Sequence, residues 1–358
     1  MKIGIVGLPN SGKTTIFNAL THGEIETSAT SSGKLETHLA VVDVPDPRVD
    51  RLSEMFRPRK TIYAQIQFND IAGLQRDVRK SAISGALLAE LSQNDALMHV
   101  VRAFEDEAVP HTETTVDPNR DIQIVDSEFV LSDLGAVEGR LERLDASAKR
   151  GKIGPTDLAE KELLTRLRAT LEQEVPIRDT EMAKADDRLI RGFQFMTAKP
   201  ALLVLNAGDN GNNLADQVQP YEHQHTDVIV IQGQLESEIA QMAADDARVF
   251  LDEFGISEPG LNRAIRAAYG LLGLHSFFTV GEDEVRAWTI RKGETAVDAA
   301  GTIHSDLARG FIRAEVIGYD DLIACGSLAV ARQRGLLRLE GRDYVVRDGD
   351  ILNIRFNV

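Results

Sequence analysis

The sequence predicts an α/β fold built around a parallel sheet, with a helical hairpin inserted into it and a small α+β domain at the C-terminal end. In residues 1–124 short apolar runs alternate with helical patterns, as expected for parallel strands that are joined by helices. The strand pattern is absent from 125 to 198 and returns at about residue 200. Residues 276–358 contain short strands and glycine turns, which are typical of a small mixed domain.

The first strand and the loop that follows it carry the most informative motif. Ile3 to Val6 is a short apolar run, and Gly7-Leu-Pro-Asn-Ser-Gly-Lys-Thr14 after it matches the pattern G-x-x-x-x-G-K-[ST] at every fixed position. In such a loop the glycines let backbone N–H groups turn inward around a triphosphate. Lys13 is then expected to reach the β- and γ-phosphates, and the Thr14 hydroxyl is expected to bind Mg²⁺. The helix that starts at about Thr15 adds its positive end beneath the same charge.

Further strands are predicted at 41–42, 62–68 and 96–101, and the second of them ends beside another nucleotide motif. Asp70-Ile-Ala-Gly73 matches the D-x-x-G element of P-loop GTPases. Asp70 would hold Mg²⁺ through water, and the Gly73 amide would bond to the γ-phosphate. We therefore predict that the catalytic residues are Lys13, Asp70 and Gly73. The predicted metal site is made of Thr14 and Asp70.

The residue after Gly73 sets an expectation for the rate of hydrolysis. Small GTPases of the Ras type have a water-orienting Gln there, whereas this chain has Leu74. An apolar side chain cannot align the attacking water. Hydrolysis is therefore expected to be slow, or to depend on another residue, a bound cation or a partner. Asn10 is a candidate ligand of a monovalent cation, K⁺, beside the phosphates.

Two histidines lie near these motifs. His99 is part of an apolar strand, and we expect it to be a satisfied core or interface residue. His111 follows Pro110 in a loop on the side of the D-x-x-G element, from which it could approach the phosphates.

Two helical segments interrupt the sheet. Leucines recur at helical spacing within 131–144 and within 163–171, and Gly151 to Pro155 breaks these segments into a hairpin. Strands return at 200–206 and 228–231, so we interpret the hairpin as an insertion within one nucleotide-binding domain. The expected organisation is a P-loop NTPase G domain (1–124 and 199–275), a coiled-coil-like helical insertion (125–198) and a C-terminal α+β domain (276–358).

Selection of the base is expected in the loop after the strand at 200–206. Asn206-Ala-Gly-Asp209 lies where GTPases carry N-K-x-D, an element whose Asp accepts hydrogen bonds from guanine. Asp209 is present, but Ala207 replaces the lysine that normally packs along the base. Gln232-Gly-Gln234 occupies the position of the S-A-K element. The chain thus retains only part of the motif that recognises guanine, so the sequence leaves the choice between ATP and GTP open.

Composition and charge limit the class of protein. The chain is 43% hydrophobic and 27% charged, and no apolar stretch approaches the roughly 18 residues of a membrane span. A single cysteine, Cys325, and an N-terminus that runs straight into a strand indicate a cytoplasmic protein without a signal peptide or a membrane partner. The net charge of −16 argues against a protein that coats nucleic acid. Arginines recur in the C-terminal domain, so RNA is a candidate partner there.

The order of these motifs resembles the YchF-type, Obg-related ATPases over nearly the whole chain. In the first domain the resemblance rests on Gly7-Leu-Pro-Asn10, Val44-Pro-Asp-Pro-Arg48, Asp70-Ile-Ala-Gly-Leu74, His99-Val-Val-Arg102 with Phe104-Glu-Asp106, and Thr197-Ala-Lys-Pro200. The end of the chain is similar to the TGS-type, β-grasp-like terminal domain of that family, in Phe277-Phe-Thr279, Arg286-Ala-Trp-Thr-Ile-Arg-Lys-Gly293, Arg309-Gly-Phe-Ile-Arg-Ala-Glu315 and Tyr344 to Val358.

This resemblance implies a nucleoside triphosphatase that binds ATP, and often GTP too, with Mg²⁺, and that associates with ribosomes or translation factors. It implies phosphate contacts from Asn10, Ser11, Gly12, Lys13, Thr14 and Thr15. It also implies base-loop contacts from Asn206, Ala207 and Asp209. The oligomeric state is not indicated.

Two departures from the family pattern affect these expectations. Family members usually have N-x-x-E in the base loop, whereas Asp209 here is shorter and compatible with guanine. The switch segment usually reads C-T-I-E-P-N, and its threonine falls on Lys34 in this chain. The usual second Mg²⁺ hydroxyl is then missing at its expected place. Two alternatives stay open: a shift of the loop that brings in another hydroxyl, or direct contact of Lys34 with the γ-phosphate. The candidate hydroxyls are those of Thr30, Ser31, Ser32 and Thr37. Because the usual Mg²⁺ contact couples the γ-phosphate to loop order, hydrolysis is expected to be impaired more than binding.

Three functions are compatible with the sequence. The leading hypothesis is a slow Mg²⁺-dependent ATPase or GTPase that acts as a conformational switch on the translation machinery. Lys34 and Leu74 favour a second one, a non-hydrolysing module in which nucleotide holds a ribosome- or RNA-binding surface in shape. Asp209 favours a third, a GTP-preferring regulator.

Overall fold

The computed structural model describes residues 1–21, 37–71, 85–208, 218–253, 256 and 258–357, and it divides the chain into two compact units. Unit 1 comprises Met1–Ala40 and Gln67–Leu271, and unit 2 comprises Val41–Ile66 and Leu272–Val358. The helical hairpin belongs to unit 1. Residues 41–66, which the sequence places in the G domain, group with the C-terminal residues. The boundaries of the three predicted domains stay a prediction.

The central sheet has the strand order β2-β4-β1-β5-β6-β7. Parallel pairing connects β4 to β1, β1 to β5, β5 to β6 and β6 to β7. This is the parallel α/β sheet that the sequence predicts, and it aligns the carboxyl ends of these strands at one edge. The strands are β1 (Lys2–Val6), β2 (Thr37–Asp43), β4 (Gln65–Ile71), β5 (Ala96–Ala103), β6 (Ala201–Ala207) and β7 (Thr226–Ile231).

The strand predicted at 62–68 is two strands in the structure. β3 (Lys60–Ile62) pairs with a strand of the C-terminal sheet, whereas β4 pairs with β1. The chain therefore changes sheets at Tyr63 and Ala64, and the sequence pattern of 62–68 does not reveal this break. β4 extends to Ile71, beyond the predicted end at residue 68, so Asp70 lies inside the end of the strand.

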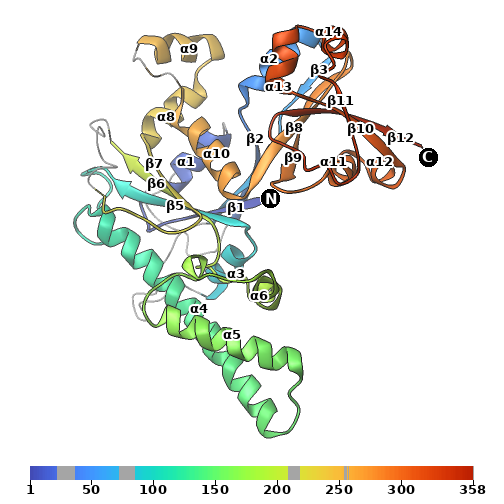
Figure 1. The fold of residues 1–358 in the computed structure, drawn as a ribbon. Coiled ribbons are helices and arrows are strands. Elements are labelled where there is room, and N and C mark those ends of the chain that lie inside the picture. Colours follow the sequence, from blue (N-terminus) through green and yellow to red (C-terminus); the bar gives the residue numbers. More distant parts are fainter. Residues whose placement is uncertain (22–36, 72–84, 209–217, 254–255, 257, 358) are drawn as a thin grey trace. The chain divides into compact units, whose positions relative to one another are not determined.

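Helices cover both faces of the sheet in unit 1 (Figure 1). On one face Leu87 and Leu91 of α3 join Val125 and Phe129 of α4 in one apolar cluster with the strands. On the other face α10 packs on β5, β6 and β7, and α1 packs on α8. These helices are α1 (Lys13–Thr21), α3 (Gly85–Ser92), α4 (Pro118–Lys149), α8 (Gly233–Gln241) and α10 (Gly260–Leu271). A further helix, α9 (Ala244–Glu253), lies between α8 and α10 in the chain.

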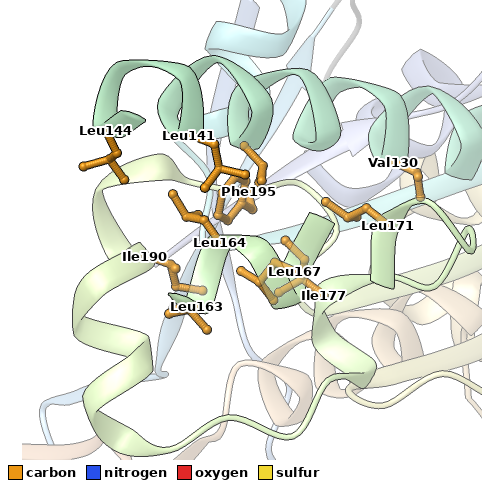
Figure 2. Close-up of a cluster of buried hydrophobic side chains, with 11 residues drawn as sticks. Val130, Leu141, Leu144, Leu163, Leu164, Leu167, Leu171, Ile177, Ile190 and Phe195 are labelled. Carbon is orange, nitrogen blue, oxygen red and sulfur yellow. The ribbon is translucent and has the colours of Figure 1, made fainter. Parts of the chain in front are cut away.

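The predicted helical hairpin is α4 and α5 (Pro155–Leu171), and most of the residues that repeat at helical spacing form its core (Figure 2). Leu131 is the exception, because it is 62% exposed. The start of α4 is fixed by Asp117, whose side chain accepts from Arg120 N. Two short 3-10 turns and α6 (Lys184–Ile190) return the chain to the sheet. The buried cluster comprises Val130, Val137, Leu141, Leu144, Leu163, Leu164, Leu167, Leu171, Ile177, Ile190 and Phe195. Burial of each such side chain contributes about 1.5–3 kcal/mol, so the hairpin is a packed element in its own right.

Unit 2 contains a mixed sheet of order β11-β10-β12-β8-β9-β3. Most neighbours are antiparallel, and β12–β8 and β3–β9 are parallel. Alanines of α11, among them Ala299 and Ala300, pack against Phe277 and Val316 of the strands. The elements are α2 (Pro47–Phe56), β8 (Leu274–Val280), β9 (Glu284–Arg291), α11 (Ala296–Ile303), α12 (Ser305–Arg309), β10 (Phe311–Gly318), α13 (Tyr319–Cys325), α14 (Leu328–Gln333), β11 (Arg338–Glu340) and β12 (Asp350–Phe356).

Arg48 explains why residues 41–66 belong to unit 2. Its guanidinium donates to Asp46, the N-cap of α2, and makes two further hydrogen bonds to the Asp348 carboxylate, at 3.0 and 3.1 Å. It also lies over the Phe278 ring, 5.1 Å from the centroid. The sequence element Val44-Pro-Asp-Pro-Arg48 is therefore an anchor within unit 2.

None of the helices in the described ranges has both the length and the apolar character that crossing a membrane requires.

Candidate nucleotide-binding site

The phosphate loop joins the end of β1 to the start of α1, and two of its glycines are required by space. A Cβ on Gly7 would lie 2.2 Å from Val100 O, and a Cβ on Gly12 would lie 2.1 Å from Asn206 Nδ2. Gly12 also has φ +91°, a conformation that other residues rarely adopt. Both fixed glycines of the sequence pattern therefore let the loop approach the strands behind it.

Lys13 is the first residue of α1, and its ammonium group is turned back into the loop. The side chain is 7% exposed, and Nζ donates to Gly7 O at 3.0 Å and to Leu8 O at 2.8 Å. Burial lowers the pKa of Lys13 to about 8, partly offset by the negative charge of Asp70. A buried ammonium whose nearest partners are neutral carbonyls is well placed to bind an anion.

Thr14 and Asp70 form a pair that fits Mg²⁺. Thr14 Oγ1 donates to Asp70 Oδ2 at 3.1 Å, and Asp70 is 1% exposed. In the described part of the chain Asp70 Oδ1 has no hydrogen-bond partner. Burial raises the pKa of Asp70, against the lowering effects of Lys13 and Thr14. A buried carboxylate oxygen without a partner, beside a hydroxyl, is a hard oxygen donor set of the kind that Mg²⁺ shares with phosphate oxygens.

Asn206 ties the phosphate loop to the base side of the site. Its Nδ2 donates to Ser11 O at 3.0 Å, and its Oδ1 accepts from Gly233 N at 3.0 Å. The side chain therefore links the loop to the first residue of α8. Ala207 ends β6 and is buried. Asp209 lies outside the described residues, as do Gly73, Leu74 and Lys34.

Ser11 and Asn10 line the loop in different ways. Ser11 Oγ is buried and has no hydrogen-bond partner among the described residues, which makes it a candidate contact for a ligand. Asn10 has φ +61°, and its Nδ2 donates to Pro110 O at 3.2 Å. In this state the Asn10 amide group is thus bonded to the 110 loop.

The two histidines have structural surroundings. His99 lies in β5 and is buried, and burial together with the positive charges of Lys13 and Arg178 lowers its pKa to about 3, so it is neutral at physiological pH. His111 Nε2 lies 2.8 Å from Asp121 Oδ2 in α4, and its Nδ1 accepts from Glu113 N. The expectation for His99 matches its burial, and His111 is engaged with the start of α4.

Arg102, at the carboxyl end of β5, was part of a family motif in the sequence analysis but was given no role there. Its Nη1 donates to Asn10 O of the phosphate loop at 3.3 Å. The sequence did contain a clue to this role, because Arg102 stands in an otherwise apolar strand. A buried arginine is costly unless specific partners bind it.

A phosphate loop between β1 and α1, an aspartate at the end of the neighbouring β4 and an asparagine at the tip of β6 define a nucleotide-binding protein with the P-loop GTPase fold. A family model described as "50S ribosome-binding GTPase" matches residues 2–117. The model of the C-terminal domain of YchF GTPases, whose description is "protein of unknown function", matches residues 274–357.

Whole-chain relatives narrow this class. The chain is 40% identical to "Ribosome-binding ATPase YchF" of Bacillus subtilis, over 99% of both chains. It is 36% identical to "Obg-like ATPase 1" of Oryza sativa subsp. japonica, over all of this chain and 92% of the other. The solved structure of the Schizosaccharomyces pombe YchF GTPase superposes with a TM-score of 0.85 at 31% identity, covering 99% of this chain and 97% of that one. The chain belongs to the YchF family.

Proposed function

We propose that the protein is a Mg²⁺-dependent nucleoside triphosphatase that uses ATP, and GTP as a second substrate, and that works as a slow nucleotide switch associated with ribosomes in the cytoplasm. The observation that carries this proposal is the pair of buried charged residues Lys13 and Asp70 at the phosphate loop, with the partly buried Thr14 hydroxyl bonded to Asp70. Relatives of nearly full length are named ribosome-binding ATPases, which supports both the reaction and the partner.

The chemistry of these residues is electrostatic. Lys13 and the backbone N–H groups of residues 10–15 would bind the phosphates and hold the transferred group in line, with little covalent work by protein groups. Thr14 would bind Mg²⁺ directly and Asp70 through water, and the metal would neutralise charge on the β- and γ-phosphates when bound. Gly73 would add its amide to the γ-phosphate. Ser11 Oγ is a further phosphate contact in this proposal, because it is buried and lacks a partner among the described residues.

Slow intrinsic hydrolysis follows from the residue types that the sequence offers for orienting the attacking water. Leu74 has no group that could orient it, and His111 is held by Asp121. A partner that supplies or releases an orienting group would then set the rate. In this proposal the ribosome is that partner. K⁺ bound beside Asn10 is the alternative, and comparing hydrolysis in K⁺ and Na⁺ buffers distinguishes the two.

An RNA contact through the C-terminal arginines is the weaker part of the partner proposal. Several of these side chains are paired inside unit 2: Arg309 bonds to Asp306, and Arg355 and Arg332 both lie against Glu315. Arg286 stacks over Trp288 at 3.8 Å. These contacts favour a scattered, solvated surface over one continuous basic face.

The test is phosphate release by the purified chain, alone and with excess ribosomes, with Lys13→Ala as the control. We expect slow release from ATP that ribosomes accelerate and that Lys13→Ala abolishes. Nucleotide binding without release under any condition would establish the non-hydrolysing module that Leu74 and Lys34 favour.

The choice of base is tested separately by competition between ATP and GTP. Asp209 favours acceptance of guanine, and Asp209→Glu is expected to shift the preference toward ATP. An unchanged ratio in that variant would remove Asp209 from the base contacts.

A further inference from the structure

The carboxyl end of β5 holds a buried arginine that the chemistry above does not use. Arg102 is 2% exposed. Its Nη1 donates to Asn10 O at 3.3 Å and its Nε donates to Phe104 O at 3.1 Å. The guanidinium lies over the Phe104 ring, with Cζ 4.4 Å from the centroid. None of these partners is a carboxylate, so they leave the positive charge of Arg102 in place directly behind the phosphate loop.

Arg102 acts on the loop together with Asn206. The two residues are register partners in the parallel pair of β5 and β6. Asn206 Nδ2 donates to Ser11 O, as Arg102 Nη1 donates to Asn10 O. Two consecutive carbonyl groups of the loop are thus held toward the carboxyl edge of the sheet.

Holding these carbonyls determines where the next N–H groups point. In a trans peptide the C=O of one residue and the N–H of the following residue point in opposite directions. The Ser11 N–H accordingly faces the inner side of the loop, where it donates to Leu8 O at 3.3 Å. Lys13 Nζ donates to the same oxygen. The amide and the ammonium therefore converge on one point inside the loop.

The conformation of Asn10 shows why an external hold is needed. Its φ of +61° is in the left-handed region, which a residue with a Cβ occupies at a cost. Asn10 is held on both sides, by its own side chain to Pro110 O and by Arg102 on its carbonyl. Without Arg102 the peptide between Asn10 and Ser11 loses the donor to its carbonyl group and keeps the hydrogen bond from Ser11 N to Leu8 O.

We propose that Arg102 is a positioning residue for triphosphate binding: it fixes the Asn10–Ser11 peptide so that the loop amides face the phosphates, and it adds behind them a positive charge whose partners among the described residues are carbonyl groups and an aromatic ring. This inference rests on the proposed function of the same loop. Lysine cannot replace it fully, because the guanidinium serves two carbonyls and an aromatic face at once, whereas an ammonium is a point charge on a flexible stem.

Arg178 provides a matched control. It is also a buried arginine of unit 1 that donates to two backbone carbonyls, those of Thr197 at 3.4 Å and Lys199 at 3.5 Å. It lies before β6, at the opposite end of that strand from Asn206. Arg178→Met therefore removes two hydrogen bonds to backbone carbonyls and one buried positive charge away from the loop, together with the hydrogen bond to the Tyr221 hydroxyl.

The experiment measures binding of a non-hydrolysable ATP analogue with Mg²⁺ to the full-length chain by calorimetry, with thermal unfolding recorded for each variant. Arg102→Met is expected to weaken binding about tenfold to a hundredfold, the size of one lost charged hydrogen bond or two. Arg178→Met is expected to bind within about twofold of the wild type while unfolding at a lower temperature. Arg102→Lys is expected to fall between Arg102→Met and the wild type.

The result that overturns the inference is wild-type affinity in Arg102→Met, or an equal loss in Arg178→Met. If Arg102→Met does not fold, Arg102→Lys decides alone: a loss of affinity of about threefold or more supports the positioning role, and unchanged affinity contradicts it. Absence of binding by the wild type is a different outcome, because it removes the proposed function itself.

Discussion

The carboxyl and amino edges of the central sheet, where the parallel strands end and begin, both contain a buried lysine and a buried arginine. The two edges nevertheless have different roles. At the carboxyl edge Lys13 donates to two loop carbonyls, and Arg102 donates to the carbonyls of Asn10 and Phe104. At the amino edge Lys199 donates to the carbonyls of Ser92 and Asn94, at 3.0 and 2.5 Å, and Arg178 donates to two more. A buried cation on backbone carbonyls is therefore not by itself a mark of a binding site.

What separates the edges is the negative charge around these cations. Burial lowers the pKa of Lys199, but Asp95 and Asp133 oppose that shift. Arg178 donates to the Tyr221 hydroxyl, which in turn donates to Asp126. The amino edge is thus neutralised by carboxylates of the chain itself, and it fastens the helical insertion to the sheet. At the carboxyl edge the described carboxylate beside Lys13 is Asp70, which the proposed function assigns to Mg²⁺. We infer that the missing counter-charge there is the nucleotide.

The two lysines test this comparison with the largest expected effect. Lys13→Met should weaken binding of MgATP about a thousandfold, because it removes the ammonium that faces the phosphates. Lys199→Met should leave the affinity within about twofold and lower the midpoint of thermal unfolding, since Ser92 O and Asn94 O lose their donor. Calorimetry and thermal unfolding of both variants provide the measurement. Equal loss of affinity in the two variants would show that the edges are not distinct.

Asp133 tests the structural role of the amino edge. Its carboxylate in α4 accepts from Met196 N, Thr197 N and Thr197 Oγ1, at 3.0, 2.8 and 2.7 Å. Asp133→Ala leaves these buried donors without an acceptor, so we expect the free energy of unfolding to fall by about 3 kcal/mol with nucleotide affinity unchanged. Glu138→Ala, at an exposed position of the same helix, is the control. Urea unfolding measures both, and a loss below about 1 kcal/mol in Asp133→Ala would contradict the role.

The sequence predicted the parts of this site whose signals are local. The phosphate loop is a contiguous pattern, so Lys13 and Thr14 could be placed from eight residues, and the leucine spacing of α4 and α5 predicted a hairpin core that the structure confirms. Contacts between distant residues leave no such pattern. The bond of Arg102 to Asn10 joins residues 92 apart in the chain, and that of Arg48 to Asp348 joins residues 300 apart. The break between β3 and β4 escaped prediction for the same reason, because it depends on which sheet each strand joins.

The proposed role of Asp70 in Mg²⁺ binding gives a further test of the difference between the two edges. Asp70→Asn keeps the size of the side chain and removes its charge. We expect the gain in triphosphate affinity that Mg²⁺ produces to fall by about tenfold or more, while affinity in the presence of a chelator stays equal to the wild type or rises, because a negative charge near the phosphates is gone. Asp126→Asn, at a partly buried carboxylate of the amino edge, should keep the full Mg²⁺ dependence. Titrations with Mg²⁺ and with a chelator distinguish the variants, and an unchanged Mg²⁺ effect in Asp70→Asn would exclude Asp70 from the metal site.

The lowered pKa of Lys13 predicts how nucleotide affinity at the carboxyl edge depends on pH. Because burial lowers this pKa to about 8 in the free protein, Lys13 is charged below pH 8 and loses its proton above it. Bound phosphate favours the ammonium and raises the pKa again, so binding above pH 8 must take up a proton. Affinity should therefore not change through Lys13 below pH 8, and it should fall by up to about tenfold per pH unit above it. Calorimetry at pH 9 in two buffers of different ionisation enthalpy measures the uptake directly. Lys13→Arg, whose side chain stays charged, should bind without this uptake, and a flat affinity of the wild type from pH 8 to about 9.5 would show that Lys13 keeps its proton in the free loop.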